Sequence, residues 1–221
     1  MHLCRFETDR TIQIGKVTAD NTVVSLSAVL DGETSMRRVL GRLPALRAAF
    51  EAVEGPATPL AQVKLLAPID DPQKYLAIGM NYQAHADEAA AAGYPAPKSQ
   101  LWFNKQVSCI TGPFDPIVRP KVSDKLDYEA ELGYVIGTKC RHVSEADALS
   151  VIAGYLICND VSVRDWQHRS PTYTLGKSFD THGPIGPWIT TADEIANPED
   201  LTMRLTVNGI VRQNAKTNDL I

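Results

Sequence analysis

An acidic segment with strict alternation, Asp127-Tyr128-Glu129-Ala130-Glu131-Leu132, constrains the fold of this chain more than any other feature. The alternation of polar and apolar residues predicts a strand, which we expect to run from Leu126 to Ile136. Alternate residues of a strand share a face, so Glu129 and Glu131 should point the same way, about 7 Å apart. Carboxylates this close repel each other unless a cation lies near them. The segment therefore predicts a cation site or, alternatively, a strand with an ordinary solvated acidic face.

A third carboxylate favours the cation site. Asp160 directly follows the apolar, strand-like run Tyr155–Asn159. Three carboxylates completed by water are the hard oxygen ligands that Mg²⁺ and Mn²⁺ prefer. We therefore predict Glu129, Glu131 and Asp160 as metal ligands. The alternative is that Asp160 only caps a turn.

A histidine–glutamate pair provides a candidate general base. The alanine-rich run from His85 to Gly93 predicts a short helix that ends at the glycine. His85 and Glu88 are three residues apart and so share one face of that helix. A histidine oriented by a glutamate can take a proton from water. The commoner role of such a pair is a surface hydrogen bond.

Several polar residues near apolar segments are further candidates for the site. Lys177 stands beside a glycine between apolar residues, and could face inward as a cation for a developing enolate. Lys105 also follows closely on apolar residues, Trp102 and Phe103, although most lysines simply lie on the surface. Arg164 and Gln167 closely follow Asp160, and could bind a carboxylate or orient the ligands.

The chain is expected to contain a small N-terminal domain, residues 1–70, and a catalytic domain, residues 71–221. The first part is β-rich, with strand-like runs and one helical region, Ser35–Val53, interrupted by Pro44. The Pro- and Asp-rich stretch Pro68–Gln73 marks the boundary. In the second part, Ser144–Asp147 resembles a capping box that opens a helix ending near Gly154. Asn208-Gly209 predicts a hairpin between Leu201–Val207 and Ile210–Asn214.

Composition narrows the possible function classes. Hydrophobic residues make up 44% of the 221 residues, enough for a real core, and the net charge of −4 argues against a nucleic-acid partner. No apolar run approaches the 18 residues of a membrane span, so no membrane partner is expected. The four cysteines lack metal-site spacing. We interpret the chain as a cytoplasmic protein with reduced thiols.

From Lys74 onward the chain carries an ordered set of short motifs. They are Ile78-Gly79-Met80-Asn81-Tyr82 with His85 and Glu88, Phe103-Asn104-Lys105, Asp127–Leu132, Val135-Ile136-Gly137, Asn159-Asp160-Val161-Ser162, Arg164-Asp165-Trp166-Gln167, Gly176–Asp180, Gly186-Pro187 and Val207-Asn208-Gly209. Together they resemble the fumarylacetoacetate hydrolase family, in particular its small bacterial-type acylpyruvate and diketo-acid hydrolases. The resemblance implies an α+β, mostly β fold: a mixed β-roll catalytic domain preceded by a small N-terminal β-rich domain.

The resemblance also implies roles for the candidate residues. Glu129, Glu131 and Asp160 match the ligands of Mg²⁺ or Mn²⁺, and His85, Glu88 and Lys177 match the catalytic residues. Lys105, Gln167 and Thr217 match positions that line the substrate site. Most members of the family are homodimers. Family members usually continue for several strands beyond the Val-Asn-Gly hairpin, so we expect this sequence to lack its C-terminal strands.

The reaction implied is hydrolysis of a carbon–carbon bond in an acylpyruvate or another 2,4-diketo acid, giving pyruvate and a carboxylic acid. Fumarylpyruvate, maleylpyruvate and diketo sugar acids are the expected kinds of substrate. The same enolate chemistry leaves two alternatives open, an oxaloacetate decarboxylase and an isomerase or decarboxylase of the 2-hydroxyhepta-2,4-diene-1,7-dioate type. A third alternative is a protein that binds a small acid without turning it over.

Overall fold

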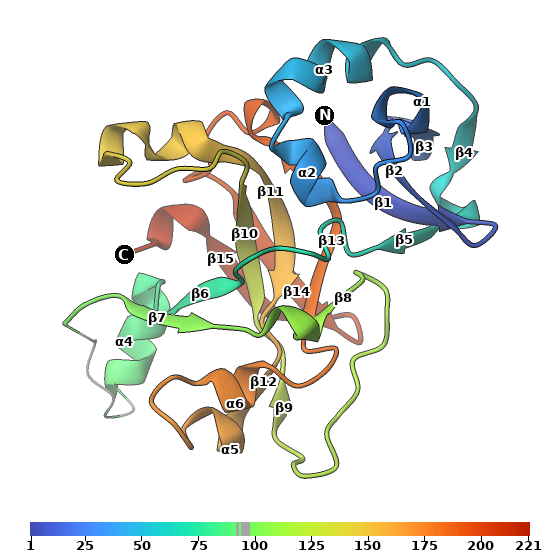
Figure 1. The fold of residues 1–221 in the computed structure, drawn as a ribbon. Coiled ribbons are helices and arrows are strands. Elements are labelled where there is room, and N and C mark those ends of the chain that lie inside the picture. Colours follow the sequence, from blue (N-terminus) through green and yellow to red (C-terminus); the bar gives the residue numbers. More distant parts are fainter. Residues whose placement is uncertain (92, 94–97) are drawn as a thin grey trace.

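The computed structural model describes residues 1–91, 93 and 98–221. The fold class expected from the sequence, α+β and mostly β, is confirmed (Figure 1). In the described part of the chain the main sheet has nine strands, in the order β10-β11-β13-β1-β2-β3-β4, with β5 beside β1 and β8 beside β13. These strands are β1 (His2–Thr8), β2 (Thr11–Val17), β3 (Thr22–Ser25), β4 (Ala57–Pro59), β5 (Lys64–Leu66), β8 (Ile110–Thr111), β10 (Ala130–Ile136), β11 (Ile152–Asn159) and β13 (Gly183–Thr191).

The main sheet crosses the domain boundary that the sequence predicted. Strand β1 of the N-terminal part pairs antiparallel with β13 of the catalytic part, with Leu3 opposite Ile189. One apolar core includes Leu3 and Ile14 from the first part and Leu156 and Ile185 from the second. The two parts therefore share a sheet and a core, while their division at residue 70 stays a prediction.

The N-terminal helices lie over the blue end of the sheet in Figure 1 and contribute Met36 and Phe50 to its core. They are α1 (Ser27–Leu30), α2 (Met36–Leu40) and α3 (Leu43–Ala52). The predicted helical region does break, but before Leu43 rather than at Pro44. Proline is tolerated in the first turn of a helix, where its missing amide hydrogen would have no partner.

The predicted strand from Leu126 to Ile136 is interrupted, which corrects the sequence interpretation. Its first part, β9 (Leu126–Asp127), pairs with β12 (Ser162–Val163), and its second part is β10, which pairs with β11. Between them the amide of Glu129 donates to the side-chain Oδ1 of Asn159 at 3.0 Å. The chain changes partners here, so regular pairing stops beside the acidic residues.

Two smaller predictions have different outcomes. Ser144 caps a helix as expected, accepting a hydrogen bond from the amide of Asp147 at 3.3 Å. That helix is a 3₁₀ helix, η3 (Glu145–Val151), and Gly154 lies within β11 instead of ending the helix. The predicted hairpin is confirmed, with Asn208 and Gly209 at the φ values of 51° and 79° that its tight turn requires.

The remaining elements belong to the catalytic part, apart from η1, which lies between β4 and β5. They are β6 (Leu76–Gly79), α4 (Gln83–Ala91), β7 (Leu101–Asn104), α5 (Arg164–Gln167), α6 (Thr174–Lys177), β14 (Thr202–Val207), β15 (Ile210–Lys216) and the 3₁₀ helices η1 (Leu60–Gln62), η2 (Val107–Cys109), η4 (Ala192–Glu194) and η5 (Thr217–Asp219). The loop expected at Tyr94–Lys98 falls largely on residues 94–97, outside the described residues. None of the described helices combines the length and the apolar character needed to cross a membrane.

Candidate active site

A buried ion-pair cluster lies where β11 ends. Asp160, just after β11, is 5% exposed, and Lys105 and Lys177 are each 2% exposed. Lys105 Nζ lies 2.7 Å from Asp160 Oδ1, and Lys177 Nζ lies 2.7 Å from Asp160 Oδ2. Each carboxylate oxygen of Asp160 therefore has its own ammonium group. This pairing permits the burial of charges that would otherwise be strongly disfavoured.

Lys105 also joins two segments of the cluster through backbone groups. Its ammonium group donates to the carbonyl oxygen of Lys177 and, at 3.3 Å, to that of Val161. Lys105 follows β7, whereas Lys177 ends α6. The sequence matched Lys105 to a position that lines the substrate site. In the structure its ammonium group donates to three oxygen atoms of the protein itself.

Glu129 is held by three donors that converge on Oε1. Lys177 Nζ lies 2.8 Å away and Arg164 Nη1 lies 2.9 Å away, and the hydroxyl of Ser162 donates to the same oxygen. Arg164 also forms an ion pair with Asp127 at 2.8 Å. Its guanidinium therefore positions carboxylates of the protein, rather than standing free to meet an acid.

Ser162 is a site residue for which the sequence analysis assigned no role. It is fully buried, and its single hydroxyl hydrogen is within reach of two acceptors, the carboxylate of Glu129 and the carbonyl oxygen of Asp160, the latter at 2.9 Å. Ser162 follows Asp160 by two residues, the spacing that places side chains on one face of an extended chain. That spacing could have identified Ser162 as a site residue from the sequence. Gln167, at the end of α5, accepts from Arg164 at 3.0 Å and so supports the same group.

Glu131, the third predicted metal ligand, lies beside the cluster without joining its ion pairs. Burial, together with the charges of Glu129 and Asp160, raises the pKa of Glu131 to about 8, so it holds a proton at neutral pH. In the part of the chain that the structure describes, no three His, Cys, Asp or Glu side chains are grouped as they would be around a metal. The ammonium of Lys177 lies between the other two predicted ligands.

Glu131 should make the stability of the metal-free protein pH-dependent. Its pKa is about 8 when folded and near 4.5 when unfolded, so between these values the folded chain keeps a proton that the unfolded chain has released. Its contribution to the free energy of unfolding is therefore complete below pH 4.5 and is lost as the pH rises through 8. In EDTA, Glu131→Gln should gain in Tm relative to the parent between pH 5 and pH 9. A Tm difference that does not change with pH would contradict this assignment.

The predicted His85–Glu88 pair lies on α4, outside the ion-pair cluster. Both residues are exposed, and only Ala86 of the helix is buried. Among the described residues no hydrogen bond joins His85 to Glu88. The three-residue spacing predicts that the two side chains share one face of the helix. It does not predict that they form a hydrogen bond with each other.

The start of α4 is held by the C-terminal residues of the chain. The amide of Ala84 donates to Asp219 Oδ2 at 3.1 Å, and the amide of Ile221 donates to the carbonyl of Asn81 at 3.0 Å. Burial and the nearby carboxylates of Glu131 and Asp219 raise the pKa of Tyr82 to about 12. Tyr82 also forms an antiparallel bridge with Leu220, so the segment just before α4 is held against the C-terminal residues.

Two residues near the C-terminal hairpin have structural contacts. Thr217 is buried, and its Oγ1 accepts from the amide of Leu201 at 2.8 Å, closing the base of the hairpin. This contact occupies the residue that the sequence matched to a substrate-site threonine. Gln213 Oε1 accepts from the amide of Ala130 at 2.8 Å, between the two glutamates. Strand β15 thus helps to position the acidic segment.

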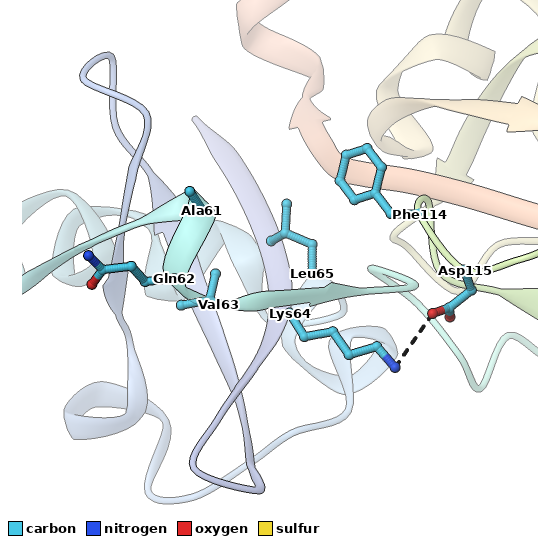
Figure 2. A pocket seen from close by; sticks show the side chains of 7 residues that line it. All are labelled: Ala61, Gln62, Val63, Lys64, Leu65, Phe114 and Asp115. Atoms are coloured by element: carbon cyan, nitrogen blue, oxygen red, sulfur yellow. Dashed lines mark ion pairs between the residues drawn. The ribbon is translucent and has the colours of Figure 1, made fainter.

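A hollow on the surface is separate from this cluster. It has a volume of about 420 Å³. Figure 2 shows the side chains that line it, from β5 and from the loop that carries Phe114. Lys64 and Asp115 form an ion pair at 3.5 Å on its wall. None of the candidate site residues lines it, so the chemistry predicted from the sequence is not located there.

Comparison with known proteins decides the family. Residues 74–221 match the family model described as fumarylacetoacetate (FAA) hydrolase, C-terminal. The chain belongs to the fumarylacetoacetate hydrolase family. Residues 1–68 match the model described as Rv2993c-like, N-terminal. The resemblance noted in the sequence is therefore confirmed.

Solved structures of related proteins share the fold of this fumarylacetoacetate hydrolase family member. Maleylpyruvate hydrolase from Sphingobium sp. SYK-6, in complex with manganese(II) and pyruvate, has a TM-score of 0.84 and 34% identity, covering 100% of this chain and 78% of its own. The 2-hydroxyhepta-2,4-diene-1,7-dioate isomerase from Mycobacterium marinum has a TM-score of 0.75 and 32% identity, covering 100% and 76%.

A curated relative adds a third activity to the family context. The mitochondrial oxaloacetate tautomerase fahd2 of Xenopus laevis is 44% identical over 163 residues, 73% of this chain. The match spans 50% of the tautomerase's own length. The named relatives thus include a hydrolase, an isomerase and a tautomerase.

Proposed function

We propose that this family member is a metal-dependent hydrolase that cleaves the carbon–carbon bond of an acylpyruvate or a related 2,4-diketo acid, releasing pyruvate and a carboxylic acid. The observation that carries the proposal is the position of Lys177, whose buried ammonium group bridges Glu129 and Asp160. An enolate-stabilising cation beside carboxylates is the arrangement that such a cleavage needs. The structural likeness to a maleylpyruvate hydrolase that holds manganese and pyruvate supports it.

The donor set suits a divalent cation. Glu129, Glu131 and Asp160 offer only carboxylate oxygens, and burial together with the charges of Glu129 and Asp160 raises the pKa of Glu131. These residues would hold Mg²⁺ or Mn²⁺, which prefer such ligands. When bound, the metal would act as a Lewis acid on the substrate's oxygens and offset their developing charge.

The chain's own residues would carry the proton and charge transfers. His85 takes a proton from water, whose oxygen bonds to the carbonyl carbon distal to the carboxylate. The carbon–carbon bond then breaks, and its electron pair forms the enolate of pyruvate. Lys177 stabilises the enolate oxygen, and a proton delivered to carbon completes pyruvate. Arg164 and Ser162 keep Glu129 oriented throughout.

One structural observation favours a second candidate, a tautomerase or isomerase. His85 and Glu88 are exposed on α4, so a water-activating pair is not assembled beside Lys177. Moving a proton along a keto–enol system needs an enolate-stabilising cation but no attacking water. The 44% identity with an oxaloacetate tautomerase supports the same alternative.

A substrate panel distinguishes the two. Acylpyruvates, sugar-derived diketo acids and oxaloacetate would be incubated with Mn²⁺ or with EDTA, while released pyruvate and enol absorbance are followed. We expect metal-dependent pyruvate and a matching acid from one diketo acid. Loss of enol absorbance from oxaloacetate without pyruvate would instead establish the tautomerase. Pyruvate from oxaloacetate alone would indicate the decarboxylase.

A further inference from the structure

We infer that Lys177 is an internal cation that competes with the divalent metal for Glu129 and Asp160, so that metal binding displaces its ammonium group. The inference rests on the metal site of the proposed function. It assigns Lys177 a second role: it neutralises the acidic site before the metal arrives, and it becomes available for substrate afterwards.

The contacts of Lys177 place its charge between two predicted metal ligands. Nζ lies 2.8 Å from Glu129 Oε1 and 2.7 Å from Asp160 Oδ2, and the side chain is 2% exposed. A divalent cation such as Mg²⁺ would approach carboxylate oxygens to about 2.0–2.1 Å. An ion bound to these two oxygens would therefore lie very close to the ammonium group. Two like charges at such a distance in a buried site repel strongly, so one must leave.

The two buried lysines differ in what else holds them. Lys105 donates to two backbone carbonyls as well as to Asp160 Oδ1, and these carbonyls would remain its partners when a metal binds. Within the described residues, Lys177 Nζ donates hydrogen bonds to the two carboxylates alone. Loss of those carboxylates to a metal therefore releases Lys177 and leaves Lys105 in place.

The ring of Phe103 lies next to the ammonium group of Lys177. Nζ lies 5.0 Å from the centre of the Phe103 ring, within the range of a cation–π contact. An ammonium group displaced from the carboxylates would stay beside this ring, inside the site. The geometry thus gives an order of events in which metal binds first and Lys177 then meets the substrate's oxygen.

Mn²⁺ affinity tests the inference without any assay of turnover. The dissociation constant would be measured by calorimetry on the full 221-residue chain, for the parent, Lys177→Met and the control Lys64→Met. Removing the competing charge should tighten Mn²⁺ binding about tenfold or more, equivalent to about 1.4 kcal/mol for each factor of ten. Lys64 pairs with Asp115 outside the cluster, so its variant should bind like the parent.

The outcomes separate this inference from the proposed function. A dissociation constant for Lys177→Met within twofold of the parent, or weaker, would overturn the competition while leaving the metal site intact. Absence of Mn²⁺ binding in the parent would overturn both. Lys177→Gln, which keeps hydrogen-bonding capacity without the charge, provides the same comparison if the methionine variant does not fold. Thermal unfolding should agree, because Mn²⁺ should raise the Tm of the neutral variant more than that of the parent.

Discussion

Asp160→Asn should lower the free energy of unfolding by about 3–5 kcal/mol, because it removes the charge that compensates two buried ammonium groups. Lys105 and Lys177 each lie 2.7 Å from one oxygen of this carboxylate, and both are almost fully buried. Asparagine has nearly the same shape, so the loss would come from charge and not from a cavity. Urea unfolding of the metal-free protein, with an unchanged m-value, would measure it.

A matched control is available on the surface. Asp193 also meets a cation through both oxygens, at 2.8 Å and 2.7 Å from the guanidinium of Arg47, but its side chain is 50% exposed. Exposed pairs of this kind contribute about 0.2–1 kcal/mol. Asp193→Asn should therefore cost less than about 1 kcal/mol. If Asp160→Asn lowers the free energy of unfolding no more than Asp193→Asn does, the charge of Asp160 is not needed to compensate the buried ammonium groups.

Gly176→Ala should strongly destabilise the protein, because the added methyl group has no room beside the site. A Cβ at this position would lie 2.4 Å from the amide nitrogen of Gln167 and 2.5 Å from its Cα. These are backbone atoms, which cannot rotate away as a side chain would. Helix α6 would have to move off α5 and carry the adjacent Lys177 out of the cluster. We expect a loss of about 1–3 kcal/mol or more in stability, as measured by urea unfolding, together with the loss of the proposed hydrolase activity.

Gly55→Ala is the corresponding control. The nearest atom to its added Cβ would be Val24 Cγ1 at 3.8 Å, an ordinary contact. Because alanine restricts the unfolded chain more than glycine does, this variant should be neutral or slightly stabilised. Equal effects of the two substitutions would show that α5 and α6 can separate without cost.

Local signals predicted the local elements of this fold. Asn208-Gly209 predicted its hairpin, because few dipeptides accept two positive φ values, and Ser144 predicted its cap through a contact three residues away. The interruption at Glu129 had no such signal. It arises because β9 and β10 pair with different strands, and pairing partners are decided far away in the sequence.

The site shows the same division between local and distant causes. Alternation in the sequence singled out Glu129 and Glu131, and the apolar residues on either side of it singled out Lys177. The burial of Lys105 against Asp160 depends on segments 55 residues apart, so no spacing rule could give it. For His85 and Glu88, helical period predicts a shared face, but the side-chain contact depends on rotamers and neighbours that the period does not specify.

The pairing of β1 with β13 has a consequence for how the protein folds. His2 lies opposite Thr190, so the edge of β1 that faces β13 finds its partner only after most of the chain has been synthesised. Contacts so distant in sequence require the closure of a very long loop, which slows folding. Strand β5 pairs with Arg5–Glu7 on this edge, so His2 and Leu3 are the part of β1 that stays unpaired until β13 is made, and unpaired strand edges are surfaces on which nascent chains associate. Chaperone assistance and low expression temperature should therefore raise the yield of folded protein.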